Sequence, residues 1–183
     1  MAPDQKLSAD EIKDLLGLEE HPTCGFVRES FRSGLRIPST DLSPSYSKND
    51  SRSLGSVLYF LVTPDAHLRL HRIRSDQMYH HYLGAPLDVL LLYPDGRGEV
   101  STIGADLRGG MRPQLFIPGG TFHVGRLRPG GAYALLATTE CPAVEPADVE
   151  IGQAAHLITD FPNLAEQIKE FAGELRPAGD RVA

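Results

Sequence analysis

The chain has 183 residues, of which 41% are hydrophobic and 23% charged, and its formal net charge is −6. These values are typical of a single globular domain with its own core, and the lack of a basic patch interleaved with aromatic residues argues against nucleic acid as a partner. The apolar runs at 57–62 and 89–93 are too short to span a bilayer, and the polar N-terminus argues against a signal peptide. We expect a cytoplasmic protein with no membrane partner and with reduced cysteines.

The first segment of the chain predicts a short helix within residues 1–18. Ser8 and Glu11 have the spacing of a capping box, in which each side chain binds the backbone N–H of the other residue. An apolar stripe begins at Ile12, and Gly17 suits the C-terminal end of a helix.

The next two segments predict a strand and a loop. Residues 25–37 alternate enough to form a strand, which Gly34 bends or ends. Residues 37–53 are rich in Ser, Pro, Asn and Asp, and this composition predicts a long exposed loop.

Residues 54–142 predict the core of a β-barrel or sandwich, because short alternating segments are separated by Gly- and Pro-containing turns at regular spacing. The expected strands are 56–63, 67–73, 77–83, 87–93, 98–103, 113–117, 122–127 and 132–139.

The end of the chain predicts a helix over residues 160–176. Leu164, Ile168, Phe171 and Leu175 recur at helical spacing, so this helix has one apolar face that we expect to pack on the outside of the barrel.

Two stretches, 68–84 and 116–127, contain most of the residues suited to chemistry. They include four of the seven histidines, namely His71, His80, His81 and His123. Imidazole is the side chain best suited to metal binding and to proton transfer near neutral pH. We therefore interpret the two stretches as two halves of one small-molecule pocket.

Strand alternation assigns the side chains of these stretches to faces. Arg69 and His71 share one face, and Gln77, Tyr79 and His81 share a face on the following strand. We place both groups inside the barrel, opposite His123. His71, His123 and Tyr79 are then the candidate catalytic residues, and the candidate substrate-binding residues are Arg69, Gln77 and His81.

The same residues leave two kinds of site open. Four of them could ligate one divalent metal ion, such as Zn, Fe, Mn or Ni, and this candidate ligand set is His71, Gln77, His81 and His123. Alternatively the cavity is metal-free, in which case Arg69 clamps a carboxylate or phosphate and a histidine moves protons.

The order of these motifs resembles the cupin superfamily, and within it the branch known as DUF985 or Cupin_5. The matching segments are LLGLEEHP, RESFRS, SVLYFLV, HRIRSDQMYHHYLGAPLDVLLL, IGADL, RPQLFIPGGTFHVGRL, YALLATTECP and VEIG, over roughly residues 15–152. The resemblance implies an all-β core in the form of a double-stranded β-helix, the cupin jelly roll, with an N-terminal and a C-terminal helix. It also implies one cupin domain over residues 1–183, an internal cavity and a homodimer.

The cupin pattern has His-x-His, then Glu, then a further His in the second motif. Here the first pair is Arg69 and His71, Gln77 replaces the Glu, and His123 has the second-motif position. A guanidinium cannot ligate a metal, so His81 is the substitute third imidazole. Near its start the family has His-Pro-Glu-Gly-Gly, whereas this chain has a threonine, Thr23, at the Glu position, which changes a polar group expected at the cavity mouth.

The resemblance leaves several functions open. The first is an enzyme of small-molecule or secondary metabolism that acts on an anionic or oxygenated substrate as an isomerase, epimerase, dehydratase or decarboxylase. The second is a metal-dependent dioxygenase. The third, from a different class, is a non-catalytic cupin that binds a sugar-like small ligand.

Overall fold

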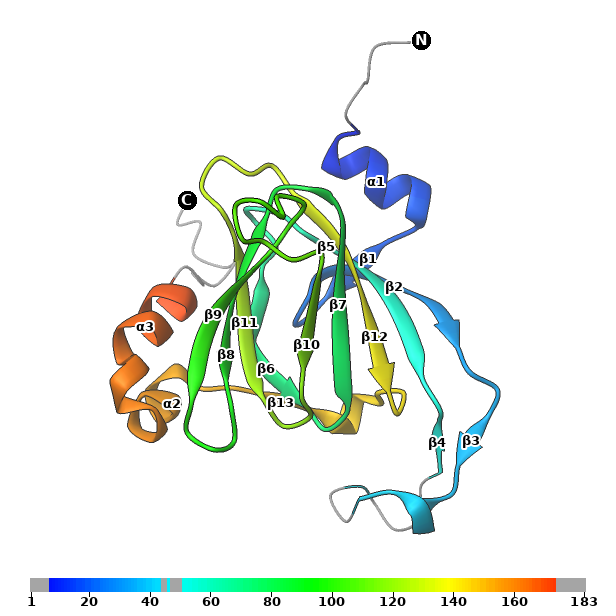
Figure 1. The fold of residues 1–183 in the computed structure, drawn as a ribbon. Helices are drawn as coiled ribbons and strands as arrows, with labels where there is room; N and C mark the ends of the chain where they lie inside the picture. The colour runs from blue at the N-terminus through cyan, green and yellow to red at the C-terminus, as the bar shows by residue number, and fades with distance from the viewer. Residues whose placement is uncertain (1–6, 44–45, 47–50, 174–183) are drawn as a thin grey trace, which may run out of the picture.

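The fold is a sandwich of two antiparallel sheets (Figure 1), as seen in a computed structural model that describes residues 7–43, 46 and 51–173. The larger sheet contains, in spatial order, β1 (Glu19–His21), β2 (Gly25–Arg32), β5 (Ser56–Val62), β12 (Ala134–Cys141), β7 (Asp76–Gly84) and β10 (Gln114–Ile117). The smaller sheet contains β13 (Val149–Ile151), β6 (Leu68–Ile73), β11 (Phe122–Leu127), β8 (Leu87–Leu92) and β9 (Gly98–Ile103). This architecture confirms the predicted jelly-roll fold class.

The strands follow from the alternation of apolar and polar residues, and those expected between 56 and 139 lie within two residues of the observed ones. Their inner faces meet in a core that buries large apolar side chains between the sheets. This core consists of Phe60, Val62, Leu68, Tyr79, Leu87, Val89, Leu91, Ile103, Ile117, Ala134 and Leu136.

The predicted N-terminal helix forms as α1 (Ala9–Leu16). The Ser8 hydroxyl accepts a hydrogen bond from the backbone N–H of Glu11, and the Glu11 carboxylate accepts one from the backbone N–H of Ser8. Gly17 ends the helix in the left-handed region, at a φ of 61°. The helix buries Ile12 against the outer face of the larger sheet.

The helix predicted over 160–176 forms as α3 (Ala165–Gly173), preceded by a 3-10 turn, η3 (Pro162–Leu164). A further helix that was not predicted, α2 (Ala154–Asp160), comes before this turn. The predicted start at 160 was wrong because Pro162 disfavours helical geometry at the residue before it. Positions 174–176 lie outside the described residues.

Both C-terminal helices still pack on the outer face of the smaller sheet, as Figure 1 shows. Ile168 and Phe171, the middle of the apolar repeat, are buried in this second core. The helical periodicity therefore predicted the buried face, although it did not predict the break.

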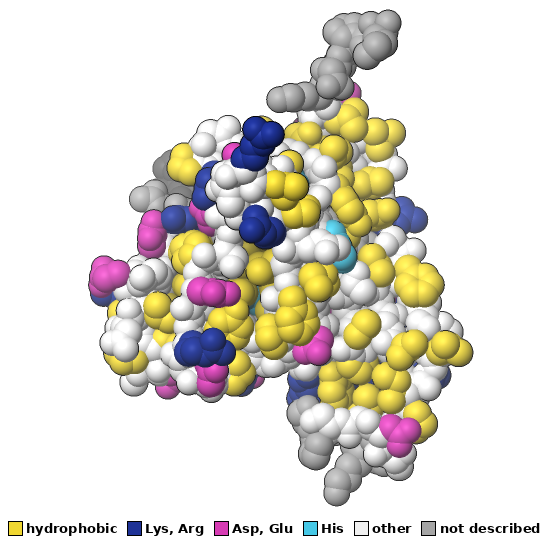
Figure 2. All heavy atoms as spheres, in the orientation of Figure 1, with side chains coloured by type: hydrophobic (Ala, Val, Ile, Leu, Met, Phe, Trp, Pro, Cys, Tyr) yellow, Lys and Arg dark blue, Asp and Glu magenta, His cyan; other side chains and the backbone are white. Residues whose placement is uncertain are grey.

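The segment predicted as an exposed loop, 37–53, is partly buried, so that prediction was wrong in part. β3 (Arg36–Ile37) pairs with β4 (Arg52–Ser53) to form an arm that projects from the sandwich (Figure 1), and Figure 2 shows hydrophobic side chains gathered on this arm. At its base, however, Arg52 is 5% exposed because its guanidinium binds the buried carboxylate of Asp148. The arm also includes Tyr46, whose hydroxyl lies 2.9 Å from the hydroxyl of Ser75.

Within the described part of the chain, no helix is both long and apolar enough to cross a membrane.

The Arg52–Asp148 pair provides a test of what fixes the arm. Asp148 also accepts hydrogen bonds from Arg74 and from the backbone N–H of Glu145. We expect Asp148→Asn to lower the free energy of unfolding by about 3–5 kcal/mol, because it removes a buried carboxylate charge that pairs with both Arg52 and Arg74. Urea denaturation measures this loss. The exposed Lys169–Glu166 pair supplies the control, since Glu166→Gln should leave the denaturation midpoint nearly unchanged.

Candidate functional site

A cavity of about 420 Å³ lies within the sandwich and is lined by both sheets, by the residues that connect β1 to β2, and by the segment that follows β12. Glu29 and Arg32, which line it and are exposed, mark its opening. Most of the wall is apolar. The polar and ionisable side chains in the lining are His21, Thr23, Cys24, Glu29, Arg32, His71, Gln77, Tyr79, Thr138, Glu140 and Glu145.

His71 and His123 lie side by side, because β6 and β11 pair with these two residues in register. Their ring centroids are 4.2 Å apart. Nδ1 of His71 lies 2.7 Å from the carbonyl oxygen of Arg69, and Nδ1 of His123 lies 3.2 Å from that of Thr121. Both rings therefore use Nδ1 as the donor and Nε2 as the acceptor when they are neutral.

Burial keeps both rings neutral near pH 7. It lowers the pKa of His71 to about 4, and it lowers the pKa of His123 well below its ordinary value, with a smaller contribution from the neighbouring His71. Only His71 lines the cavity, since His123 is 0% exposed and lies behind the wall.

Tyr79 and Gln77 connect the cavity to His123. The Tyr79 hydroxyl lies 2.9 Å from Nε2 of His123, and the Gln77 amide nitrogen lies 3.5 Å from the same atom. Because Nε2 is the acceptor of the neutral ring, Tyr79 donates this hydrogen bond. Burial raises the pKa of Tyr79 well above its ordinary value, so Tyr79 remains a phenol.

Arg69 does not point into the cavity, contrary to the sequence-based prediction. It is exposed and donates a hydrogen bond to the carbonyl oxygen of Pro22 at 3.2 Å. The reason is a register shift between β6 and β11, in which His123 pairs with His71 but Gly125 pairs with Leu68. This β-bulge breaks the strict alternation that had placed Arg69 on the face of His71.

His81 is also absent from the lining among the described residues. Its Nε2 lies 3.0 Å from the carbonyl oxygen of Ala85, at the end of β7, where the pairing with β12 shifts by one residue. The third imidazole expected beside His71 and His123 is therefore engaged elsewhere.

The remaining residues do not fit a resident divalent metal ion. No three His, Cys, Asp or Glu side chains gather around one point in the described ranges. Of the predicted ligands, those that remain are the imidazoles of His71 and His123 and the neutral amide of Gln77, and Nε2 of His123 is already bound by the Tyr79 hydroxyl. Zn, Fe, Mn and Ni sites in proteins need a fuller set of imidazole, thiolate or carboxylate ligands than this.

Glu140 is the most buried of the ionisable lining residues that the sequence analysis missed. It extends from β12, is 7% exposed, and lies opposite Gln77 in the pairing with β7. The Ser56 hydroxyl donates a hydrogen bond of 2.8 Å to its carboxyl group. Burial raises the pKa of Glu140 to about 7, and the hydrogen bond from Ser56 opposes this shift only in part.

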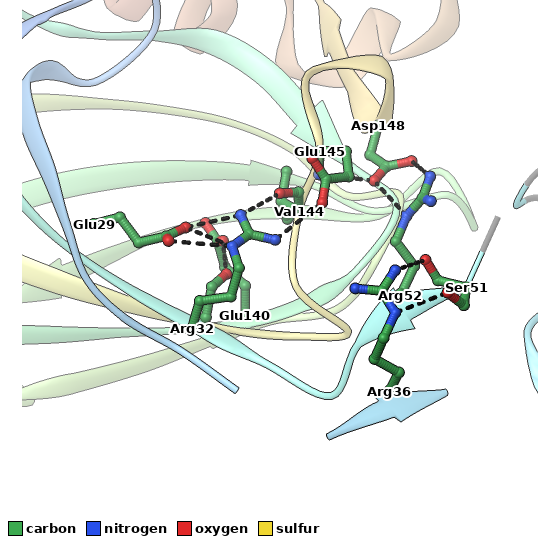
Figure 3. Close-up of polar contacts among 10 residues, drawn as sticks. Glu29, Arg32, Arg36, Ser51, Arg52, Glu140, Val144, Glu145 and Asp148 are labelled. Atoms are coloured by element: carbon green, nitrogen blue, oxygen red, sulfur yellow. Dashed lines mark hydrogen bonds and ion pairs between the residues drawn. The ribbon is translucent and has the colours of Figure 1, made fainter. Parts of the chain in front are cut away.

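An ion-pair cluster borders the opening of the cavity. The Arg32 guanidinium binds the carboxylate of Glu29 at 2.8 Å, that of Glu145 at 3.0 Å, and the carbonyl oxygen of Val144 at 3.2 Å (Figure 3). Figure 3 also shows Glu140 close to this cluster. Arg32 thereby ties the end of β2 to the segment that follows β12.

Comparison with known proteins fits this architecture. The family model Cupin_5, described as "Cupin superfamily (DUF985)", matches residues 10–152. The chain belongs to the Cupin_5 family. An uncharacterised Saccharomyces cerevisiae protein, YML079W, is 25% identical to this cupin over 130 residues, which are 69% of this chain and 65% of the yeast protein.

Two solved structures resemble this cupin over nearly their whole length. A hypothetical protein from Leishmania major has a TM-score of 0.78 and 25% identity, and the match covers 91% of this chain and 99% of that one. Protein SO0799 from Shewanella oneidensis has a TM-score of 0.77 and 27% identity, with 94% and 99% covered.

In this cupin the segment that departs from the family pattern does line the cavity, as expected. Thr23 stands where the family has Glu, and its hydroxyl lies 3.1 Å from Nδ1 of His21 and 3.2 Å from the sulfur of Cys24. Burial raises the pKa of Cys24 to about 12, so its side chain is a thiol rather than a nucleophilic thiolate.

The pH dependence of stability tests the environment of Glu140. Its pKa is higher in the folded protein than the ordinary 4.5, so the unfolded chain ionises first as the pH rises. Relative to Glu140→Gln, the wild type should lose on the order of 2–3 kcal/mol of unfolding free energy between about pH 4.5 and pH 7, and no more above pH 7. The difference between the two proteins is the quantity to measure, because the neutral His71 and His123 shift stability in the opposite direction. A constant difference across this range would contradict the raised pKa.

Metal analysis tests the fit of the donor set. Protein purified without a chelator or affinity tag should contain far less than one metal ion per chain. The two accessible donors, the His71 imidazole and the Gln77 amide, bind a divalent metal ion only weakly. A stoichiometric metal ion that is lost from both His71→Ala and His123→Ala, while these variants remain folded, would contradict this expectation.

Proposed function

We propose that this cupin is an enzyme that binds a small oxygenated organic molecule in the cavity and transfers a proton at a carbon next to the oxygen function. Glu140 is the general acid and base. The reaction class is an isomerisation or a dehydration, because both remove a proton from one carbon and return a proton to another atom.

The observation that carries the proposal is a single carboxyl group buried in a largely apolar cavity, with a pKa near the operating pH. A pKa of about 7 for Glu140 means that the acid and the carboxylate are both populated at neutral pH. A proton-transfer catalyst is most effective under this condition, and desolvation is the usual way in which enzymes raise a carboxyl pKa to this range.

The groups around Glu140 can bind or orient the substrate, but Glu140 itself performs the proposed proton transfer. Neutral His71 presents Nε2 as a hydrogen-bond acceptor, and the Gln77 amide lies opposite Glu140 in the strand ladder. The low pKa of His71 makes it a poor proton donor at neutral pH, so the proton transfer expected of the histidines is assigned here to Glu140. Tyr79 and His123 hold each other in the wall as a donor–acceptor pair.

The other reactions considered from the sequence have less support. A decarboxylase needs a cation for the substrate carboxylate, but Arg69 lies outside the cavity and Arg32 is occupied by two carboxylates. A dioxygenase needs a metal ion that the donor set does not fit. The homodimer and the cytoplasmic location stay predictions.

Exchange of carbon-bound hydrogen with solvent tests the proposal without knowledge of the natural substrate. In D₂O, the wild type should incorporate deuterium next to the carbonyl group of some member of a panel of neutral cyclic ketones and hydroxyketones, as measured by NMR. The rate should rise through about pH 7, because the carboxylate form of Glu140 is the base. Glu140→Gln should reduce the rate by about 10²–10⁴-fold.

Glu99→Gln is the matched control. Glu99 lies on β9 outside the described cavity lining, and its exposed carboxylate accepts a hydrogen bond from the Tyr93 hydroxyl. Its rate should equal that of the wild type. If the panel binds but neither the wild type nor Glu140→Gln exchanges deuterium, the cavity is a binding site without catalysis.

A further inference from the structure

We infer that the ligand of this cavity is a neutral molecule with an apolar body and one hydroxyl or carbonyl oxygen, which Thr138 binds beside Glu140. The inference rests on the proposed function, since it assigns the substrate class of the same cavity. It rests on which polar groups in the lining already have hydrogen-bond partners and on the charged groups around them.

Thr138 is a buried polar residue in the cavity wall whose hydroxyl has no partner. Its side chain lines the cavity and is 6% exposed, yet its Oγ1 makes no hydrogen bond to any described residue. A hydroxyl left unpaired in this way costs about 1–3 kcal/mol, and such a group in a native fold points to a missing partner.

The other hydroxyl groups that line the cavity are already paired. The Tyr79 hydroxyl binds His123, and the Thr23 hydroxyl lies within hydrogen-bond distance of His21. Thr121, a second buried residue whose hydroxyl has no partner, lies outside the described lining. Thr138 is thus the described lining residue whose hydroxyl is left to bind a ligand oxygen.

Strand geometry places Thr138 next to the proposed catalytic group. Thr138 and Glu140 are two residues apart on β12, so both side chains point to the inner face, about 6–7 Å apart along the strand. A hydroxyl can donate to a carbonyl oxygen or accept from an alcohol. A ligand oxygen held by Thr138 would therefore place the adjacent carbon within reach of the Glu140 carboxyl.

The rest of the wall selects an apolar body. Much of the lining is aliphatic or aromatic, and these side chains include Val27, Leu58, Phe60, Ile73, Val149 and Ile151. Contact with such a wall favours a hydrocarbon portion by about 25 cal/mol per Å² of apolar surface removed from water. A polyhydroxylated sugar would bury several hydroxyl groups here without partners.

The charges disfavour an anion. Among the described residues, three carboxyl groups line the cavity, those of Glu29, Glu140 and Glu145, and the one guanidinium there, that of Arg32, already binds two of them. A ligand carboxylate would thus enter without a free cation and beside Glu140, which is itself partly ionised at neutral pH. Of the two substrate classes expected from the sequence, anionic or oxygenated, the inference keeps the oxygenated class and makes it neutral.

Binding of three matched probes tests this assignment. Cyclohexanol, cyclohexanecarboxylate and cyclohexylamine share one apolar ring and differ in charge, and none needs catalysis to be detected. Ligand-observed NMR titration at pH 7 should rank cyclohexanol first. The carboxylate should bind at least tenfold more weakly because it meets no free cation, and the ammonium should bind more weakly because the largely apolar wall removes its hydration. Equal or tighter binding of either charged probe would overturn the neutral class.

Substitution at Thr138 tests the residue. Thr138→Val should weaken cyclohexanol roughly three- to tenfold, the loss of one hydrogen bond, whereas Thr138→Ser should retain most of the affinity. Thr139→Val is the matched control, because Thr139 faces the outer surface and lies against His80. The melting temperature of Thr138→Val should equal or exceed that of the wild type, since the variant removes an unpaired buried hydroxyl.

The two proposals fail in different ways. If Thr138→Val binds cyclohexanol as the wild type does, or melts several degrees lower, the hydroxyl has a structural role and the inference is wrong, even where deuterium exchange still depends on Glu140. If the probe ranking and the Thr138 effect hold, the inference stands, and a lack of exchange then counts against the catalytic role of Glu140 alone.

Discussion

The antiparallel pairing of β7 with β12 is the constraint on which the site depends. Its register sets Glu140 opposite Gln77 and Thr138 opposite Tyr79, so that one face of two central strands presents four polar side chains to the interior of an apolar sandwich. Each of these groups must find a partner there or remain unpaired, because all four side chains are buried. Ser56 and His123 provide two of the partners, and the ligand is inferred to provide another.

Burial then decides which groups can carry charge. It makes imidazolium costly, so His71 and His123 are neutral, and it makes carboxylate costly, so Glu140 is balanced between its two forms. The same low-polarity surroundings therefore disfavour His71 and His123 as acids and support the proposal that the Glu140 carboxyl group takes up and releases a proton near pH 7. The histidines, the most conspicuous residues in the sequence, instead shape the wall and accept hydrogen bonds.

Much of the fold could be predicted from sequence because alternation and turn residues act locally. The strands, the Ser8 capping box and the burial of His71 and His123 followed from that pattern. The positions of Arg69 and His81 did not, because each lies beside a one-residue register shift that depends on the partner strand. Glu140 was missed because its strand was expected to end at 139. A signal was nevertheless available, because Glu140 continues the alternate positions of β12 at which Ala134 and Leu136 face the core.

The segment from Val144 to Val149 forms part of the cavity wall, and arginines hold it at two points. Arg32, at the end of β2, binds Glu145, and Arg52, on β4, binds Asp148. These two arginines lie at the two ends of the projecting arm in the sequence, so their ion pairs connect the arm directly to this part of the cavity wall. A change in the length or composition of the arm would therefore shift this wall segment and alter which ligands fit the cavity. Related chains could differ in specificity in this way while the residues inside the cavity stay the same.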